Sequence, residues 1–130
     1  MNDVRSIPIV VAEDEFLVRE VLTEHLHDAG YEVLEAENSD EALKLIQVHA
    51  GVRALITDVQ MPGGTLDGIE LAFFVHERWP SVHIIVCSGR VRPRANELPP
   101  GVEFLAKPFS GNRLLTTVHT LLERPDPRSL

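Results

Sequence analysis

The sequence predicts an α/β fold in which a five-stranded parallel sheet carries helices on both of its faces. Short apolar segments alternate along the 130-residue chain with segments whose apolar residues recur at helical spacing. Such alternation is typical of a parallel sheet, because each crossover between parallel strands needs a helix that covers the sheet. Hydrophobic residues make up 44% of the chain and charged residues 25%, which are the proportions of an ordinary globular domain.

Five short apolar segments bounded by polar residues are expected to be strands. They cover residues 7–12, 31–36, 53–58, 82–88 and 102–106. The first is continuously apolar, which is typical of a strand buried on both faces of a sheet. The only cysteine, Cys87, lies in the apolar fourth segment, so we expect a buried thiol without a disulfide partner.

Four other segments have the apolar spacing of amphipathic helices. They cover residues 15–29, 40–50, 69–79 and 114–122. Gly30, Gly51 and Pro80 follow the first three, at positions where helices commonly end. Asn38 or Ser39 is the expected N-cap of the second helix, because either side chain can accept a hydrogen bond from the first turn.

The segment from Arg90 to Pro100 interrupts the alternation. It contains three arginines and three prolines, so a fourth helix there must be short or irregular, between Arg94 and Leu98. The three arginines suit either a docking patch for an acidic partner or a solvated basic loop, and the second interpretation is favoured.

This order of elements favours a flavodoxin-like, doubly wound sheet with the strand order 2-1-3-4-5. We expect one domain over residues 1–124 and a loose tail over 125–130. In such sheets ligands bind beyond the carboxyl ends of the strands, where the strand order reverses. The residues at the strand ends are therefore the first candidates for a functional site.

The net charge of −8 argues against several classes of function. Twenty acidic residues against twelve basic ones disfavour binding to nucleic acid or to anionic lipid. No apolar segment approaches the length of a membrane span, and the N-terminus lacks a signal-peptide layout, so a cytoplasmic protein is expected. The six histidines show no spacing typical of metal ligands and are expected on the surface.

Three carboxylates and a lysine fall at the ends of the expected strands. Glu13 and Asp14 follow the first strand, Asp58 ends the third, and Lys107 follows the fifth. These ends share one edge of a parallel sheet, so the side chains should converge. The lysine offsets only one of the three negative charges, and a divalent cation would neutralise the remainder. Hard oxygen ligands without histidine or cysteine favour Mg²⁺.

Asp58 is the expected nucleophile of this site. An aspartate beside Mg²⁺ and a lysine can attack phosphorus, since phosphoryl transfer needs mainly positioning and neutralisation of charge. Asp58 ends the strand nearest the centre of the sheet and precedes the loop 59–68. Ser88 and Lys107, at the ends of flanking strands, can reach phosphoryl oxygens.

Short motifs follow the strand ends in a fixed order. They are Glu13-Asp14, Asp58 with Met61-Pro62 and Asp67-Gly68, Ser88-Gly89, and Lys107-Pro108-Phe109. Each motif is weak alone, but together and in this order they are a strong signal. On these motifs the chain resembles a receiver domain of a two-component response regulator, over residues 7–122.

The resemblance implies a phosphoacceptor and a metal site. Asp58 would accept a phosphoryl group from a phosphohistidine of a sensor histidine kinase or a histidine phosphotransfer protein. Asp14, Asp58 and the backbone carbonyl of Gln60 would bind Mg²⁺ directly, and Glu13 would act through a coordinated water.

The resemblance also implies a conformational switch. Ser88 would hydrogen-bond the phosphoryl group, Lys107 would pair with it, and Phe104 is similar to the aromatic residue that turns inward when the serine moves. An ordinary core position is an equally good interpretation of Phe104. The Lys107–Pro108 peptide bond would be cis, as is usual in receivers.

Some positions depart from the common receiver pattern. Glu13 stands where aspartate is commoner, and Phe104 lacks the hydroxyl of the commoner tyrosine. The stretch 63–66 makes the loop after Asp58 about two residues longer than the commonest form, so different access to the site is expected.

Gln60 and Arg90 occupy the two positions that tune phosphoryl lifetime in receivers. They lie two residues beyond Asp58 and Ser88, respectively. Changing either residue should therefore alter the rate of dephosphorylation.

The expected function is a phosphorylation switch in a single-domain regulator. Phosphorylation of Asp58 would shift a pre-existing equilibrium at the face formed by the last strand and the fourth and fifth helices, and so change binding to a downstream protein target. Dimerisation on phosphorylation remains open. We expect no enzymatic activity beyond Mg²⁺-dependent self-phosphorylation and slow autodephosphorylation.

Three alternatives remain open. The chain could be a receiver excised from a longer regulator, or an interaction module that works without phosphorylation. A small enzyme on the same fold ranks last, because Gln60 occupies the position of the second aspartate of haloacid-dehalogenase-like phosphatases, and because the chain has no phosphate-binding loop for a flavin.

Overall fold

The computed structural model describes residues 7–90 and 92–125. The elements follow one another as β1 (Pro8–Ala12), α1 (Phe16–Asp28), β2 (Glu32–Ala36), α2 (Ser39–Val48), β3 (Ala54–Asp58), α3 (Gly68–Arg78), β4 (His83–Ser88), the short 3-10 helix η2 (Ala95–Glu97), β5 (Glu103–Ala106) and α4 (Gly111–Leu122). The predicted alternation of strands and helices is confirmed. The expected tail 125–130 lies, apart from its first residue, outside the described residues.

The five strands form one sheet in the order β2-β1-β3-β4-β5, and every neighbouring pair is parallel. This is the strand order that the sequence predicts. The order reverses beside β1, because the chain runs from β1 outward to β2 and then returns across β1 to β3. The carboxyl ends of β1 and β3 therefore border the position where such sheets bind ligands.

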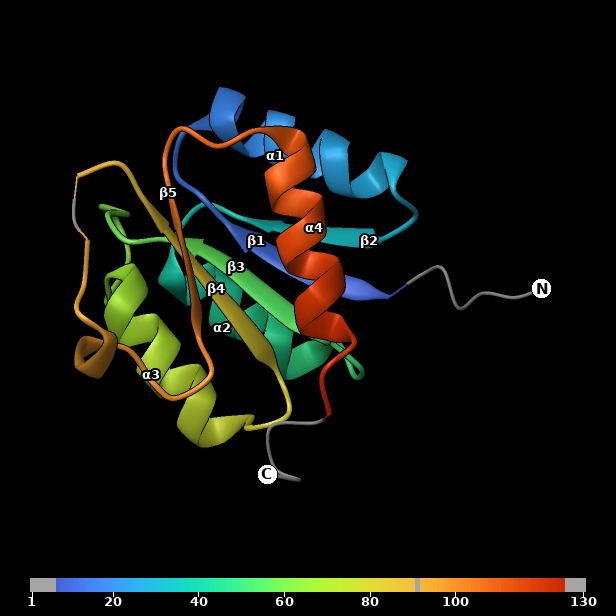
Figure 1. Cartoon of the computed structure of the whole chain (residues 1–130). Coiled ribbons are helices and arrows are strands. Elements are labelled where there is room, and N and C mark those ends of the chain that lie inside the picture. The colour runs from blue at the N-terminus through green and yellow to red at the C-terminus, as the bar shows by residue number, and fades with distance from the viewer. Residues whose placement is uncertain (1–6, 91, 126–130) are drawn as a thin grey trace.

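Helices cover both faces of the sheet, as expected (Figure 1). Helices α2 and α3 pack on one face, and their buried residues form a core with alternate residues of the central strands, such as Val10, Leu55 and Val86. Helices α1 and α4 pack on the other face against the intervening residues, such as Val11 and Ile85. The strands β1, β3 and β4 are buried on both faces, which explains why most of their residues are apolar.

Side-chain caps fix the beginnings of three helices. Asn38, one of the two expected caps, accepts a hydrogen bond from the backbone of Glu41 at the start of α2. In α3, Asp67 and Glu70 form a reciprocal capping box. Ser110 caps α4 in the same way as Asn38 caps α2. No helix of the described chain is long and apolar enough to cross a membrane.

One expectation is confirmed and another is wrong. The helix expected between Arg94 and Leu98 is short: it is η2, a single 3-10 turn, because proline removes backbone donors on both sides of this segment. His83, expected on the surface with the other histidines, is buried at the start of β4. Its neighbours Val82 and Ile84 are apolar and buried, and β4 is an interior strand between β3 and β5.

Candidate functional site

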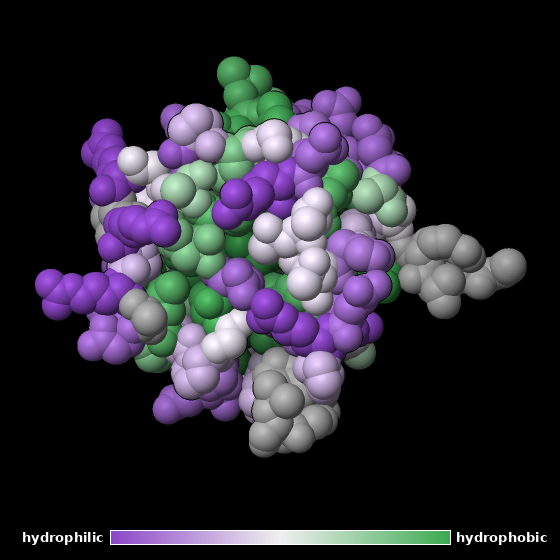
Figure 2. Space-filling view, in the orientation of Figure 1, coloured by the Kyte–Doolittle hydropathy of each residue, from purple (hydrophilic) through white to green (hydrophobic). Residues whose placement is uncertain are grey.

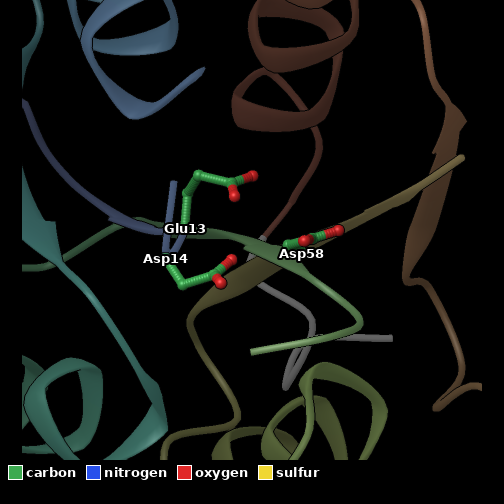
Figure 3. A group of neighbouring side chains, drawn as sticks. All are labelled: Glu13, Asp14 and Asp58. Atoms are coloured by element: carbon green, nitrogen blue, oxygen red, sulfur yellow. The ribbon is translucent and has the colours of Figure 1, made fainter. Parts of the chain in front are cut away.

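The carboxyl edge of the sheet brings three carboxylates together. Glu13 and Asp14 directly follow β1, and Asp58 is the last residue of β3 (Figure 3). One carboxylate oxygen from each lies within 4.8 Å of the other two. The Glu13 side chain is almost fully buried, at 2% exposure, whereas 14% of the Asp58 side chain is exposed. The predicted convergence is therefore observed, with Asp58 accessible from solvent.

Lys107 joins this acidic cluster from the end of β5. Its Nζ lies 2.9 Å from Oε1 of Glu13 and 3.4 Å from Oδ1 of Asp58. Its backbone N–H donates to the carbonyl of Ser88, which continues the pairing of β5 with β4 beyond the last strand residue. The peptide bond to Pro108 is cis, the isomer that the resemblance implies. One ammonium thus bridges two of the three carboxylates.

Burial and charge shift the pKa values of these groups in predictable directions. Burial raises the pKa of Asp58 above its ordinary value of 3.8, although Lys107 opposes the shift. The pKa of Glu13 is also raised, first by burial and further by the charge of Asp58. Burial lowers the pKa of Lys107, but its contacts with Glu13 and Asp58 outweigh this effect, and the net shift is upward. The lysine therefore stays charged at neutral pH, while the clustered carboxylates favour protons or a cation.

A buried arginine of α1 hydrogen-bonds to the backbone of the acidic cluster. Arg19 of α1 donates from Nη1 to the backbone carbonyl of Glu13 at 2.7 Å, and its Nε lies 3.0 Å from a carboxylate oxygen of Glu35. Sequence reasoning missed this residue. The available signal was its position three residues before Leu22 and seven before Leu26, which places a cation on the buried face of the helix.

The end of β4 contributes a hydroxyl to the same edge. Ser88 is buried, and its Oγ accepts a hydrogen bond from the backbone N–H of Arg90 at 3.2 Å. Its register partner in β5 is Ala106, directly before Lys107. Gly89 and Arg90 are exposed. Ser88 is thus at the carboxyl edge, as expected from the sequence.

The loop between β3 and α3 is closed at its base. The backbone N–H of Gly68 donates to the carbonyl of Val59 at 2.7 Å. A Cβ at Gly68 would lie 1.8 Å from the carbonyl oxygen of Asp58, so this position requires glycine. Gln60 is exposed between the buried residues Val59 and Met61. The expected role of the Gln60 carbonyl as a metal ligand stays a prediction.

Phe104 lies in β5 and is half-buried, packed at the margin of the α2–α3 core. The guanidinium of Arg92 lies 5.4 Å from the centroid of its ring, within the range of a cation–π contact. The aromatic ring is therefore neither free in solvent nor fully enclosed. This intermediate environment suits both interpretations of Phe104, as a core residue and as a switch residue.

The acidic cluster fits a hard divalent cation. Its donors are carboxylate oxygens, the ligands that Mg²⁺ prefers. Lys107 offsets one of the three negative charges, and a divalent cation would neutralise the negative charge that remains. Among the described residues this is the one cluster of three potential metal ligands. Asp14 and Asp58 would hold the ion directly, since both carboxylate oxygens of Glu13 already accept hydrogen bonds, Oε1 from Lys107 and Oε2 from the backbone N–H of Glu15.

Comparison with known proteins defines the class of protein. The response regulator receiver domain family matches residues 9–119, so the chain belongs to this family. Its structure is similar to that of a response regulator receiver protein from Sinorhizobium medicae, with a TM-score of 0.84 and 26% identity, over 92% of this chain and 97% of the other. The flavodoxin-like fold and the two-component signalling family predicted from the motifs are therefore confirmed.

Two sequence relatives are longer proteins. The chain is 35% identical over 125 residues to the sensor kinase CckA of Brucella abortus, which covers 93% of this chain and 13% of that protein. It is 28% identical over 113 residues to an NtrX-like response regulator of Rickettsia typhi, which covers 85% of this chain and 24% of that protein. The chain thus spans a quarter or less of the length of these relatives.

Proposed function

We propose that this receiver domain accepts a phosphoryl group on Asp58, in a reaction that requires Mg²⁺, and changes its binding to a protein target as a result. The observation that carries the proposal is the acidic cluster with Lys107: an accessible aspartate, two further carboxylates and a lysine at hydrogen-bond distance. Family membership supports the same role.

The chain's own residues suit each part of this transfer. An oxygen of Asp58 attacks the phosphorus of a phosphohistidine, the phosphorus–nitrogen bond breaks, and its electron pair stays on the imidazole of the donor. Bound Mg²⁺ would supply charge neutralisation for the phosphoryl oxygens. Lys107 and Ser88 then pair with the oxygens of the phosphorylated side chain.

Release of Lys107 is part of this proposal. In the unphosphorylated protein its ammonium contacts Glu13 and Asp58. A phosphoryl group on Asp58 carries more charge than the carboxylate and would draw Lys107 and Ser88 toward it. Phe104, three residues before Lys107 on β5, would follow this movement and alter the surface around Arg92.

The phosphodonor is a sensor histidine kinase or a histidine phosphotransfer protein in the cytoplasm. Two large apolar side chains in the first turn of α1, Phe16 and Leu17, are 59% and 75% exposed. Figure 2 shows this apolar patch at the top of the molecule, over the start of α1. Because α1 follows the acidic pair directly, a partner that covers the patch would lie next to Asp58.

The proposed activity is that of a phosphoacceptor and not of a turnover enzyme. Self-phosphorylation from a small donor and slow autodephosphorylation are the reactions we assign to it. Gln60 and Arg90, both exposed at the rim of the site, are proposed to set the phosphoryl lifetime. Gln60→Ala and Arg90→Ala should each change the decay rate of the phosphorylated protein, and equal decay rates in the wild type and both variants would refute this role.

Intact mass after incubation with Mg²⁺ and a small acyl phosphate tests the main proposal. The wild type should gain one phosphoryl group that is stable in acid and labile in base, and Asp58→Asn should gain none. Asp28→Asn, which changes an exposed aspartate of α1, is the matched control and should behave like the wild type. A wild type that gains no mass favours an interaction module, and rapid donor turnover without retained mass favours an enzyme.

A further inference from the structure

The loop between β3 and α3 is anchored to the beginning of α2. The backbone N–H of Leu66 donates to Oγ of Ser39 at 2.9 Å. Thr65 donates to the carboxylate of Asp40 from its backbone N–H at 3.4 Å and from its hydroxyl at 3.2 Å. These three hydrogen bonds, here called the loop contact, join segments that are about 25 residues apart in the chain.

The loop contact is closely packed. Ser39 is fully buried although it lies in the first turn of α2. A Cβ at Gly64 would lie 2.6 Å from Oγ of Ser39 and 2.9 Å from its backbone nitrogen, so no larger residue fits there without moving the loop. Gly64 belongs to the stretch 63–66, for which the sequence predicts a longer loop than the commonest receiver form. This stretch is packed against the beginning of α2.

Two sets of contacts thus restrain the loop from both sides of Gln60. At the base, Val59 donates to the carbonyl of Cys87 and accepts from Gly68. Toward the tip, the loop contact holds Thr65 and Leu66. A long loop fixed only at its base would sample more backbone conformations, and a second anchor removes part of that entropy before a ligand binds.

We propose that Ser39 and Asp40 are positioning residues for the reaction at Asp58: through the loop contact they restrain the loop that carries Gln60, and so preorganise this loop for a cation bound at the acidic cluster. The inference rests on the proposed function, because it concerns the same metal site. It assigns a role at the site to Ser39 and Asp40 of α2, which lie outside the motifs at the strand ends.

Amide exchange and Mg²⁺ affinity together test the inference. In Ser39→Ala, the Leu66 amide should exchange at least about fivefold faster in the metal-free protein, and the dissociation constant for Mg²⁺ should rise about fivefold, as expected for one lost hydrogen bond. Thr117→Ala is the matched control. It removes one exposed hydroxyl hydrogen bond of α4, on the other face of the sheet from α2, so its Mg²⁺ affinity should stay within about twofold of the wild type.

A second pair of variants avoids the buried position. Thr65→Val removes one exposed hydroxyl from the loop contact and should weaken Mg²⁺ binding, whereas Thr65→Ser keeps the hydroxyl and should restore it. Faster exchange in Ser39→Ala and Thr65→Val with unchanged Mg²⁺ affinity would overturn the positioning role. Loss of affinity in Thr117→Ala equal to that in Ser39→Ala would also overturn it. A wild type that binds no Mg²⁺ would refute the proposed function together with this inference.

Discussion

At the scale of single residues, burial decides which charges matter. Glu13, Asp58 and Lys107 lie within a few ångströms of one another, and burial outweighs the lysine in its effect on the pKa of Asp58. The uncompensated carboxylate charge therefore costs stability in the metal-free protein. The Asp58 carboxylate, on which the proposed function depends, therefore lowers the stability of the metal-free protein.

Asp58→Asn should stabilise the metal-free protein at pH 7.5, because it removes a carboxylate whose pKa is raised by burial. A raised folded-state pKa means that the folded protein binds the proton more tightly than the unfolded chain. The cost of the charge is then present at neutral pH and disappears as the pH falls below 3.8. Urea unfolding in EDTA at several pH values measures the difference, which should shrink toward pH 4. A destabilised Asp58→Asn at neutral pH would contradict this account.

The Cys87 thiol should be inert in the folded protein. Burial raises its pKa to about 12, so only about one molecule in ten thousand carries the thiolate at pH 8. The rate of reaction with a thiol reagent at pH 8 should rise at least about 100-fold when the protein is unfolded in guanidinium. Comparable rates in the two states would show that β4 opens readily.

At the scale of elements, the helix beginnings shape the functional edge. The loops that lead from β1, β3 and β5 into α1, α3 and α4 carry the acidic pair, Gln60 and Lys107. The capping box of α3 closes the loop after Asp58, and Gly68 permits close contact with the Asp58 carbonyl. The residues that begin α3 thus also determine the path of the loop after Asp58.

Asp67→Ala should lower the free energy of unfolding by about 1 kcal/mol, because it removes the side chain that accepts from the backbone of Glu70 in the first turn of α3. Glu70→Gln is the matched control, since glutamine can still accept from the backbone of Asp67. Urea unfolding followed by circular dichroism measures both variants. An equal loss in the two variants would show that charge, and not capping geometry, governs this position.

At the scale of the whole molecule, metal binding and folding are linked. The acidic cluster joins the ends of β1 and β3, and Lys107 links it to the end of β5, although these strands are distant in sequence. Because these carboxylates converge only in the folded protein, a cation that binds them stabilises the fold as a whole.

Mg²⁺ should raise the thermal unfolding midpoint in a concentration-dependent way. At 100 times the dissociation constant, the free energy of unfolding should increase by about 2.7 kcal/mol. The gain should be smaller at pH 5 than at pH 7.5, because Glu13 and Asp58 have raised pKa values and protons compete with the cation. Sodium chloride at matched ionic strength is the control for screening. An equal gain with sodium chloride would show that the cation effect is nonspecific.

The strand order, the two-sided helix packing and the strand-end positions of the site residues were predictable from the sequence. Local periodicity determines strands and helices, and right-handed parallel crossovers limit how they assemble. The prolines around residues 94–98 correctly predicted that the helix there is short, a single 3-10 turn. The burial of His83 was not, because its side chain is covered by the arrangement of neighbouring elements and not by its own segment.

The sequence by itself determined which residues reach the carboxyl edge of the sheet: each site residue directly ends or follows a strand, which is a local property. Only the tertiary structure decided what those residues contact. Lys107 bonds to Glu13 across 94 positions, Arg19 holds the Glu13 carbonyl, and Ser39 accepts from Leu66 across 27. Such contacts depend on side-chain directions after the helices have packed, and no local pattern encodes the distance between segments that the fold brings together.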